Sequence, residues 1–234
     1  MTADPAEAPP WRESGLARKL VAEGVGSAML LAVVVGSGIM GERLSGGNAA
    51  IALLGNTVAT GAGLVVLISI FGPISGAHFN PIVTAMFVAR RGTPWVVGLG
   101  YALVQFVGAV LGVFTAHVMF AMPTVQVSEK VREGPHQAFA EAVATFGLIA
   151  VILGALRFRP QAAPMLIGLY ITAAYWFTAS TSFANPAVAV ARSFTNTFTG
   201  IAPTSVPGFI LGECLGGVLA VATFGWLFAQ EHKP

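Results

Sequence analysis

Two short apolar segments that each contain Asn-Pro constrain the fold of this chain more than any other feature. They read ISGAHFNPIVTAMF at residues 74–87 and SFANPAVAVARSF at residues 182–194. The first predicts a helix over residues 80–89, because Arg90 and Arg91 follow at once. A helix of about ten residues rises about 15 Å, half of the roughly 30 Å hydrocarbon core of a membrane. Each segment therefore predicts a helix that enters a membrane and stops halfway.

The composition requires a membrane around most of the surface. Of 234 residues, 55% are hydrophobic and 9% are charged, whereas a soluble domain has about 25% charged residues. A crossing helix needs roughly 20 mostly apolar residues, and such stretches occur at residues 20–40, 49–72, 94–119, 138–156, 164–180 and 207–228. We therefore predict an all-α polytopic membrane protein with six transmembrane helices and two re-entrant half-helices.

The termini and the charge limit the function classes. Residues 1–19 are polar and proline-rich, without a cleavage site after the first apolar stretch, so we interpret them as a cytoplasmic tail. Residues 20–229 form one predicted channel domain, and residues 230–234 a second cytoplasmic tail. A net charge of +2 is too small to suggest nucleic acid, and a single cysteine excludes an internal disulfide or a cysteine metal site. We expect no metal, no cofactor and no enzyme activity.

Basic residues predict the orientation, because cytoplasmic loops carry an excess of Lys and Arg. With the N-terminus inside, the cytoplasmic side holds Arg12, Arg18, Lys19, Arg90, Arg91, Arg157, Arg159 and Lys233. The other side holds Arg43, Lys130, Arg132 and Arg192. We therefore predict that both termini are cytoplasmic, and that the membrane is a bacterial inner membrane.

The two halves of the chain repeat one another. AEGVGSAMLLAVVVG from Ala22 aligns with AEAVATFGLIAVILG from Ala140, and QFVGAVLGVFTA from Gln105 aligns with ECLGGVLAVATF from Glu213. Repeat one covers residues 20–119 and repeat two residues 138–229. Each half contains three full spans, an odd number, so the second half enters the membrane from the opposite side. Inverted repeats of this kind place their site at the midplane, between the halves.

The Asn-Pro pairs predict how the half-helices begin and what they offer a solute. Pro81 and Pro186 suit the first helical position, and Asn80 and Asn185 before them are preferred N-caps. The two positive helix ends meet at the centre and repel cations, while the asparagine amides donate to a neutral oxygen. The preceding loops are non-helical at membrane depth, where exposed carbonyls line a passage. The carbonyls expected there belong to Gly76, Ala77, His78 and Phe183.

These segments carry a family resemblance. SGAHFNPIVT and FANPAVAVARS resemble the paired Asn-Pro-Ala boxes of the aquaporin and aquaglyceroporin (major intrinsic protein) family, and the likeness extends over nearly the whole chain. It includes Glu23, Glu141 and the QFVGAVLG of the third span. The resemblance implies a homotetramer in which each protomer has its own pore for small neutral solutes.

The chain departs from the family pattern at the boxes. The first box ends in Ile82 where Ala is usual, and the second keeps Ala187 but continues with Val188, where most relatives have the selectivity-filter Arg. The resemblance assigns Thr60 and Ser182 to the filter too. Its helix-five position is ambiguous among Ala173, Ala174 and Tyr175.

A filter of Thr60, Ser182 and Val188 has neither aromatic bulk nor a fixed cation. An Arg supplies five donors and a permanent charge, and a Val supplies neither. We therefore expect a wide pore that passes glycerol-like polyols and neutral metalloid acids such as arsenous acid, as well as water. The pattern resembles the aquaglyceroporin-like branch that bacteria use in arsenic resistance.

Several ionisable residues allow alternatives. Arg192 lies close to two helical turns after Asn185 and therefore on the same face of the half-helix. It either replaces the charge of the missing filter arginine or, as we expect, extends to the outer interface of the membrane. Glu23 and Glu141 are expected to accept N–H groups of the re-entrant loops. Glu213 aligns with Gln105 and is expected to make a buried contact between helices.

The sequence predicts a passive channel, and three rivals stay open. One is a water-selective aquaporin narrowed by another residue, Arg192 first. The second is a proton-coupled transporter, which would need a titratable residue beside the substrate site. The third is a structural or adhesion role with a closed pore, which no sequence feature favours.

Overall fold

The computed structural model describes residues 14–228, and within them it is built from helices in the order that the repeat predicts. Part of the predicted N-terminal tail, residues 1–13, and the predicted C-terminal tail lie outside the described residues. The elements are α1 (Leu16–Leu44), α2 (Ala49–Ser75), α3 (Pro81–Ala89), α4 (Trp95–Met119), α5 (Pro135–Phe158), η1 (Pro160–Ala162), α6 (Ala163–Phe177), α7 (Pro186–Arg192), η2 (Pro203–Ser205) and α8 (Val206–Leu227).

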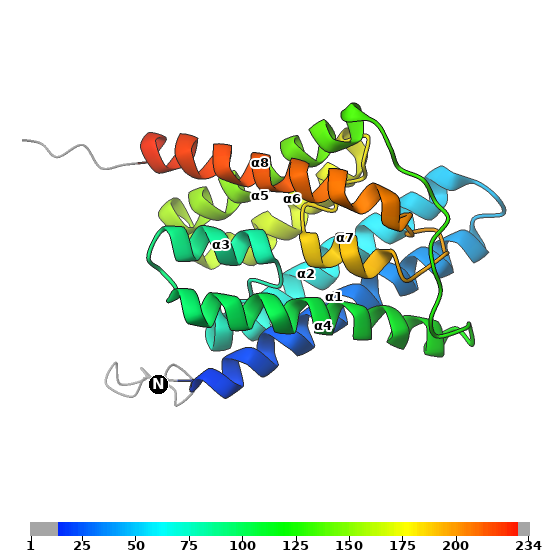
Figure 1. The fold of residues 1–234 in the computed structure, drawn as a ribbon, viewed down its shortest axis with the longest axis horizontal. Coiled ribbons are helices and arrows are strands. Elements are labelled where there is room, and N and C mark those ends of the chain that lie inside the picture. Colours follow the sequence, from blue (N-terminus) through cyan, green and yellow to red (C-terminus); the bar gives the residue numbers. More distant parts are fainter. Residues whose placement is uncertain (1–13, 229–234) are drawn as a thin grey trace, which may run out of the picture.

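Helices α1 and α5 begin at opposite ends of the bundle and run in opposite directions (Figure 1). The same view shows α3 and α7 lying in the middle, one extending toward each end, while α1 begins and α8 ends at the same end. This is the arrangement that two inverted repeats, α1–α4 and α5–α8, produce. The half-helices have nine and seven residues, short as predicted.

Five helices of the described chain, α1, α2, α4, α5 and α8, are long and apolar enough to cross a membrane. The sixth predicted crossing, α6, has 15 residues and ends at Phe177, three residues earlier than predicted. It ends there because Thr178 turns into extended backbone, where its hydroxyl bonds to the carbonyl of Ala174 at 2.7 Å. The short turn η1 precedes it directly.

Two helix ends correct the predictions. Helix α1 begins at Leu16, inside the predicted tail. Helix α2 continues through Pro73 to Ser75, so the first re-entrant loop begins at Gly76 and not before the proline. Gly76 ends the helix in the left-handed conformation, φ 93°, and its N–H bonds to the carbonyl of Gly72. This is the ordinary way in which a glycine closes a helix.

Small residues bring the long helices of each repeat into close contact. A methyl group at Gly108 or Gly112 of α4 would overlap the carbonyl oxygen of Gly24 or Ala28 of α1, respectively. In the second repeat, Gly212 and Gly216 of α8 meet the carbonyls of Ala138 and Ala142 of α5 in the same way. Glycines spaced four residues apart let two helix backbones approach closely. Such packing matters in a membrane, because the hydrophobic effect does not drive helices together in lipid. The two pairs hold the frame in which the loops sit.

Candidate functional site

The two re-entrant loops share one unusual backbone pattern. Positive φ angles occur in the same order in both: Gly76, Ala77 and Phe79 in the first loop, Thr181, Ser182 and Ala184 in the second. Non-glycine residues rarely adopt this conformation, and each such position costs of order 1–3 kcal/mol. Neighbouring groups must therefore hold both loops in place.

Glu23 of α1 holds the first loop and is fully buried. Its Oε1 accepts the Ser75 hydroxyl at 2.6 Å and the N–H of His78 at 2.9 Å. Its Oε2 accepts the N–H of Phe79 at 2.8 Å and Nε2 of Gln105 at 2.8 Å. The two bonds to loop N–H groups favour one loop conformation, because any other would leave these buried groups without partners.

Glu141 of α5 has the matching place in the second repeat. Its two oxygens accept the N–H groups of Phe183 at 2.9 Å and Ala184 at 2.6 Å. Glu213 of α8 accepts the N–H of Asn185 at 2.9 Å. Both glutamates are fully buried. The predicted buried contact of Glu213 is thus to the loop that precedes α7.

Gln105 and Glu213 occupy matching positions but differ in what they can donate. The Gln105 amide donates to Glu23 and to the Thr84 hydroxyl. The Oε2 atom of Glu213, by contrast, has no hydrogen-bond partner within residues 14–228. An ionised carboxylate only accepts, whereas a protonated one donates one bond. The second repeat thus contains an acid where the first contains an amide.

Asn80 and Asn185 connect the two loops at the centre of the molecule. Each side-chain oxygen caps its own half-helix, accepting the N–H of Ile82 at 2.9 Å or of Ala187 at 3.0 Å. The amide of Asn80 donates to the carbonyl of Ala184 at 2.7 Å, and the amide of Asn185 donates to the carbonyl of Phe79 at 2.8 Å. An amide group has two N–H donors, so one remains on each asparagine.

A cavity of about 140 Å³ lies beside both asparagines. Its volume is enough for several water molecules. One wall is apolar and comes from the long helices: Leu30, Val34, Leu64, Leu148, Ile152 and Ile171. The other wall comes from the loops and α7. It includes the predicted site residues Gly76, Ala77, His78, Asn80, Ser182, Phe183, Asn185 and Val188.

The structure separates the remaining predicted residues into two groups. Thr60 and Tyr175 line the cavity, and the Tyr175 hydroxyl lies 3.4 Å from that of Thr60. Ala173 and Ala174, the other possible helix-five positions, do not belong to the lining. Nor do the remaining box residues, Pro81, Ile82, Pro186 and Ala187, which shape the half-helices instead.

Arg192 corrects the sequence prediction. It does not extend to the outer interface: it is 2% exposed and lines the same cavity as Val188. The reason is that residues 193–202 fold back over the end of α7, where the N–H of Ile201 bonds to the Arg192 carbonyl at 3.3 Å. The Arg192 Nε donates to the carbonyl of Thr199, and its Cζ lies 3.4 Å from the centroid of the Phe183 ring.

A second arginine reaches the same ring from the connection between α4 and α5. The Arg132 Cζ lies 5.4 Å from the Phe183 centroid. Its Nε donates to the Gly200 carbonyl at 3.1 Å, and its Nη1 to the Ser180 carbonyl at 3.3 Å. Burial lowers the pKa of the Arg132 guanidinium, and the nearby Glu141 carboxylate raises it. Arginine keeps its charge in proteins, so this end of the cavity is cationic.

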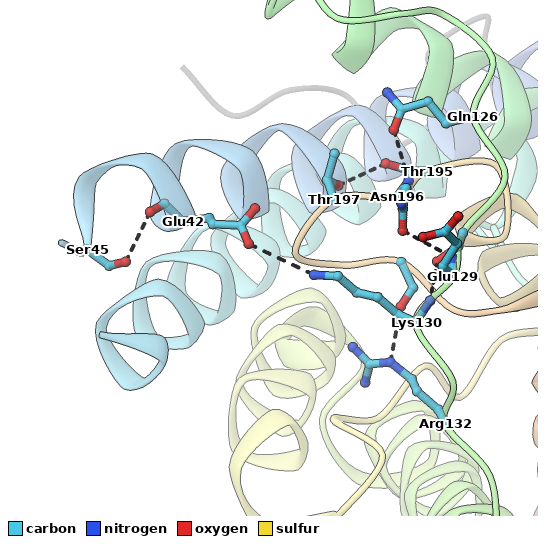
Figure 2. Close-up of polar contacts among 11 residues, drawn as sticks. Glu42, Ser45, Gln126, Glu129, Lys130, Arg132, Thr195, Asn196 and Thr197 are labelled. Atoms are coloured by element: carbon cyan, nitrogen blue, oxygen red, sulfur yellow. Dashed lines mark hydrogen bonds and ion pairs between the residues drawn. The ribbon is translucent and has the colours of Figure 1, made fainter. Parts of the chain in front are cut away.

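Polar contacts fasten the α4–α5 connection over this end of the molecule. Figure 2 shows Lys130 extending toward Glu42 of α1, with a distance of 3.9 Å between Nζ and Oε1. Asn196 accepts the N–H of Glu129 at 3.0 Å and its own N–H bonds to the Gln126 side chain at 3.0 Å (Figure 2). The exposed Lys130–Glu42 pair is worth little by itself, so the backbone contacts position Arg132.

A larger cavity of about 730 Å³ lies toward the end where α1 begins, with Leu16 and Lys19 in its lining. It shares His78 and Phe87 with the cavity between the loops. The two rings stack with centroids 4.4 Å apart, and the His78 Nδ1 lies 3.1 Å from the Thr84 hydroxyl. The stacked His78–Phe87 pair is therefore part of the lining that the two cavities share.

Comparison with known proteins identifies the family. Residues 10–224 match the Major intrinsic protein family. The chain belongs to that family. It is 54% identical over 223 residues to the aquaglyceroporin AqpS of Rhizobium meliloti (strain 1021), covering 95% of each chain. It is 34% identical over 196 residues to the aquaporin NIP2-3 of Zea mays, covering 80% of this chain and 63% of that one.

The fold is also that of a solved family member. The X-ray structure of the aquaglyceroporin from Plasmodium falciparum superposes with a TM-score of 0.66 at 19% identity, covering 90% of this chain and 96% of that chain. The predicted major intrinsic protein family and all-α fold are thus confirmed. As a member of the major intrinsic protein family, the chain is a multi-pass membrane protein and a channel for small neutral solutes, not an enzyme.

Sequence reasoning missed the arginine pair beside the Phe183 ring. Arg132 was only counted for orientation, and Arg192 was expected to lie elsewhere. Two signals pointed to them: both arginines belong to the side with few basic residues, and Arg192 follows the apolar run PAVAVA without a flanking charge. A cation in such a run is buried by default and needs a partner.

Proposed function

We propose that this protein is a passive channel for small uncharged polar solutes: glycerol-like polyols, neutral metalloid acids such as arsenous acid, and water. The observation that carries the proposal is the free amide N–H of Asn80 and of Asn185 beside the cavity. These donors face an apolar wall, so a neutral solute with one polar edge satisfies both surfaces. The high identity to a protein named aquaglyceroporin supports the same solute class.

The proposed selectivity filter consists of Thr60, Tyr175, Ser182 and Val188. Val188 lines the cavity and is 6% exposed, so its small apolar side chain leaves room where a long side chain would close the passage. We propose that the filter is wide for this reason. We propose that arsenous acid passes because it is small and neutral, and that the channel serves in arsenic resistance.

The loop glutamates have a supporting role in this proposal. Glu23, Glu141 and Glu213 contact loop N–H groups and do not belong to the cavity lining. A proton-coupled transporter needs a titratable group beside its substrate, so their position argues against coupling. We further propose a homotetramer in a bacterial inner membrane, with the end at which α1 begins and α8 ends facing the cytoplasm.

A water-selective channel is the second candidate function. The burial of Arg192 beside the cavity favours it, because a guanidinium there narrows the passage and replaces the missing filter charge. The small apolar side chain of Val188 in the cavity lining favours the wider channel instead. Permeability measurements separate the two.

Stopped-flow permeation of purified protein in liposomes tests the proposal with water, glycerol and arsenous acid as solutes. We expect the wild type to pass all three and Val188→Arg to exclude the two larger ones. Val188→Met is the matched control, because it adds length without charge. A wild type that passes only water supports the second candidate, and passage of none of the three solutes overturns the channel proposal.

A further inference from the structure

Two glutamates of the second repeat lie together in the interior. Glu141 of α5 and Glu213 of α8 are both fully buried, and their carboxyl groups lie within hydrogen-bonding reach of one another. The glycine packing of the two helices brings them to the same level. Gly212 and Gly216, on either side of Glu213, meet carbonyls of α5 that lie on either side of Glu141. Two carboxyl groups that meet in this way cannot both be ionised without strong repulsion.

One oxygen of this pair has nothing to bond to while both groups are ionised. Oε1 of Glu213 accepts the N–H of Asn185 at 2.9 Å, and the two Glu141 oxygens accept the N–H groups of Phe183 and Ala184. Oε2 of Glu213 is buried and has no hydrogen-bond partner within residues 14–228. An ionised carboxylate only accepts, whereas a protonated one also donates. A proton on Oε2 therefore turns the contact with Glu141 into a hydrogen bond.

The first repeat contains the neutral counterpart of this arrangement. Gln105 occupies the place of Glu213, and its Nε2 donates to Oε2 of Glu23 at 2.8 Å. Glu23, like Glu141, accepts two consecutive N–H groups of its loop. A protonated Glu213 is equivalent to Gln105 as a donor. Each repeat then has one negative charge beside its loop.

The surrounding charges distinguish the two carboxyl groups. Arg192 of α7 and Arg132 of the α4–α5 connection both act on Glu141 and favour its ionised form. Among residues 14–228, the charged group that acts on Glu213 is Glu141 itself. Two uncharged titratable groups also face the pair, Tyr170 of α6 and Cys214 of α8. The negative charge therefore belongs on Glu141 and the proton on Glu213.

A metal ion between the two carboxyl groups is the rival explanation. Cations that bind oxygen, such as Mg²⁺ and Ca²⁺, take about six to eight ligands. Three of the four carboxyl oxygens already accept backbone N–H groups. Groups of three side chains that could hold a metal do not occur in the described part of the chain. A proton needs only the two oxygens that it joins, so it fits where a metal ion does not.

We propose that Glu213 is a positioning residue that stays protonated at neutral pH and donates a hydrogen bond from Oε2 to Glu141. Together the two carboxyl groups hold three consecutive N–H groups, those of residues 183–185. The last of these belongs to Asn185, which lines the cavity. The bound proton thus fixes the second asparagine and keeps a second negative charge away from it.

Infrared spectroscopy of the purified protein in an ester-free detergent tests the bound proton. At about pH 8 exposed glutamates are ionised, so the C=O stretch of a protonated carboxyl group reports buried acids alone. We expect this band in the wild type and its loss in Glu213→Gln. Glu23→Gln is the matched control and should keep the band, because Glu23 is a buried loop glutamate whose partner is an amide. A wild type without the band, as two ionised carboxylates or a bound cation would give, overturns the inference. A band that survives in Glu213→Gln also overturns it.

Glycerol permeability of folded protein in liposomes tests the positioning role. Glu213→Leu should lower it by about fivefold or more, because one buried N–H loses its partner. Glu213→Gln keeps an acceptor and a donor and should restore most of the loss. Equal permeability of the leucine variant and the wild type overturns the positioning role. A wild type that passes no glycerol overturns the channel function instead, and the infrared spectrum still decides whether the proton is bound.

Discussion

Replacing Gly217 by alanine should reveal why the first box ends in Ile82. Ile82 is partly buried and packs against α8, where a methyl group added at Gly217 would lie 2.7 Å from the Ile82 Cγ2. Carbon atoms in ordinary contact are about 3.5–4.0 Å apart. Ile82 is branched at Cβ, so this methyl group cannot swing away without changing the rotamer. Isoleucine in the box therefore fits because residue 217 has no side chain.

The expected magnitudes follow from this overlap. Overpacking costs about 1–3 kcal/mol, whereas replacing glycine by alanine inside a helix gains about 1 kcal/mol. Gly217→Ala should therefore lower the free energy of unfolding by up to about 2 kcal/mol in the wild type. In an Ile82→Ala background the overlap is gone, and the same change should raise it by about 1 kcal/mol. The effect of one substitution thus changes sign with the residue at position 82.

Thermal unfolding of the four variants in detergent completes this cycle. Gly208→Ala is the matched control, because Gly208 is also in α8 and nothing lies within 4 Å of an added methyl group there. It should behave alike in both backgrounds. If Gly217→Ala has the same effect, within about 0.5 kcal/mol, with Ile82 and with Ala at that position, the two residues are independent and the packing explanation is wrong.

Two further predictions concern α8. Glu213→Gln should change the free energy of unfolding by less than about 1 kcal/mol. The glutamine amide oxygen can still accept the N–H of Asn185, and its NH₂ group supplies the donor that Gln105 supplies in the first repeat. Glu213→Leu should lower the free energy of unfolding by about 1–3 kcal/mol, because it leaves the Asn185 N–H without a partner. Equal losses in thermal unfolding for both would contradict this explanation. Cys214 is exposed on α8 and lies outside the cavity lining, so mercurials should inhibit solute flux only weakly. Strong block at low mercury concentration, absent in Cys214→Ser, would refute this placement.

Most of the architecture could be predicted from spacing alone. Apolar run lengths, the odd number of spans in each half and the two Asn-Pro pairs suffice to predict inverted repeats with paired half-helices. The prolines and asparagines are local signals, since they act on their own helix ends, and the capping bonds of Asn80 and Asn185 show why such signals are reliable. Helix ends were less predictable, as the extension of α2 through Pro73 illustrates.

The arrangement around Arg192 could not be predicted in the same way. The position of Arg192 depends on residues 193–202, which fold back over α7, and on an arginine from the distant α4–α5 connection that approaches the same ring. No periodicity encodes such a contact, because it joins irregular segments far apart in the chain. The helix-five position was ambiguous for a similar reason: that Tyr175, and not Ala173 or Ala174, lines the cavity depends on how α6 packs against α2.

The reciprocal bonds between the asparagines and the opposite loops have a consequence for biosynthesis. The amide of Asn80 and the carbonyl of Phe79 are made early, but their partners, Ala184 and Asn185, are more than a hundred residues further along the chain. Until the second repeat is made, the Asn80 amide and the Phe79 carbonyl need other hydrogen-bond partners, and water is the simplest of these. The two halves of the passage are therefore completed at the same moment, late in synthesis, and neither half can mature as an independent unit.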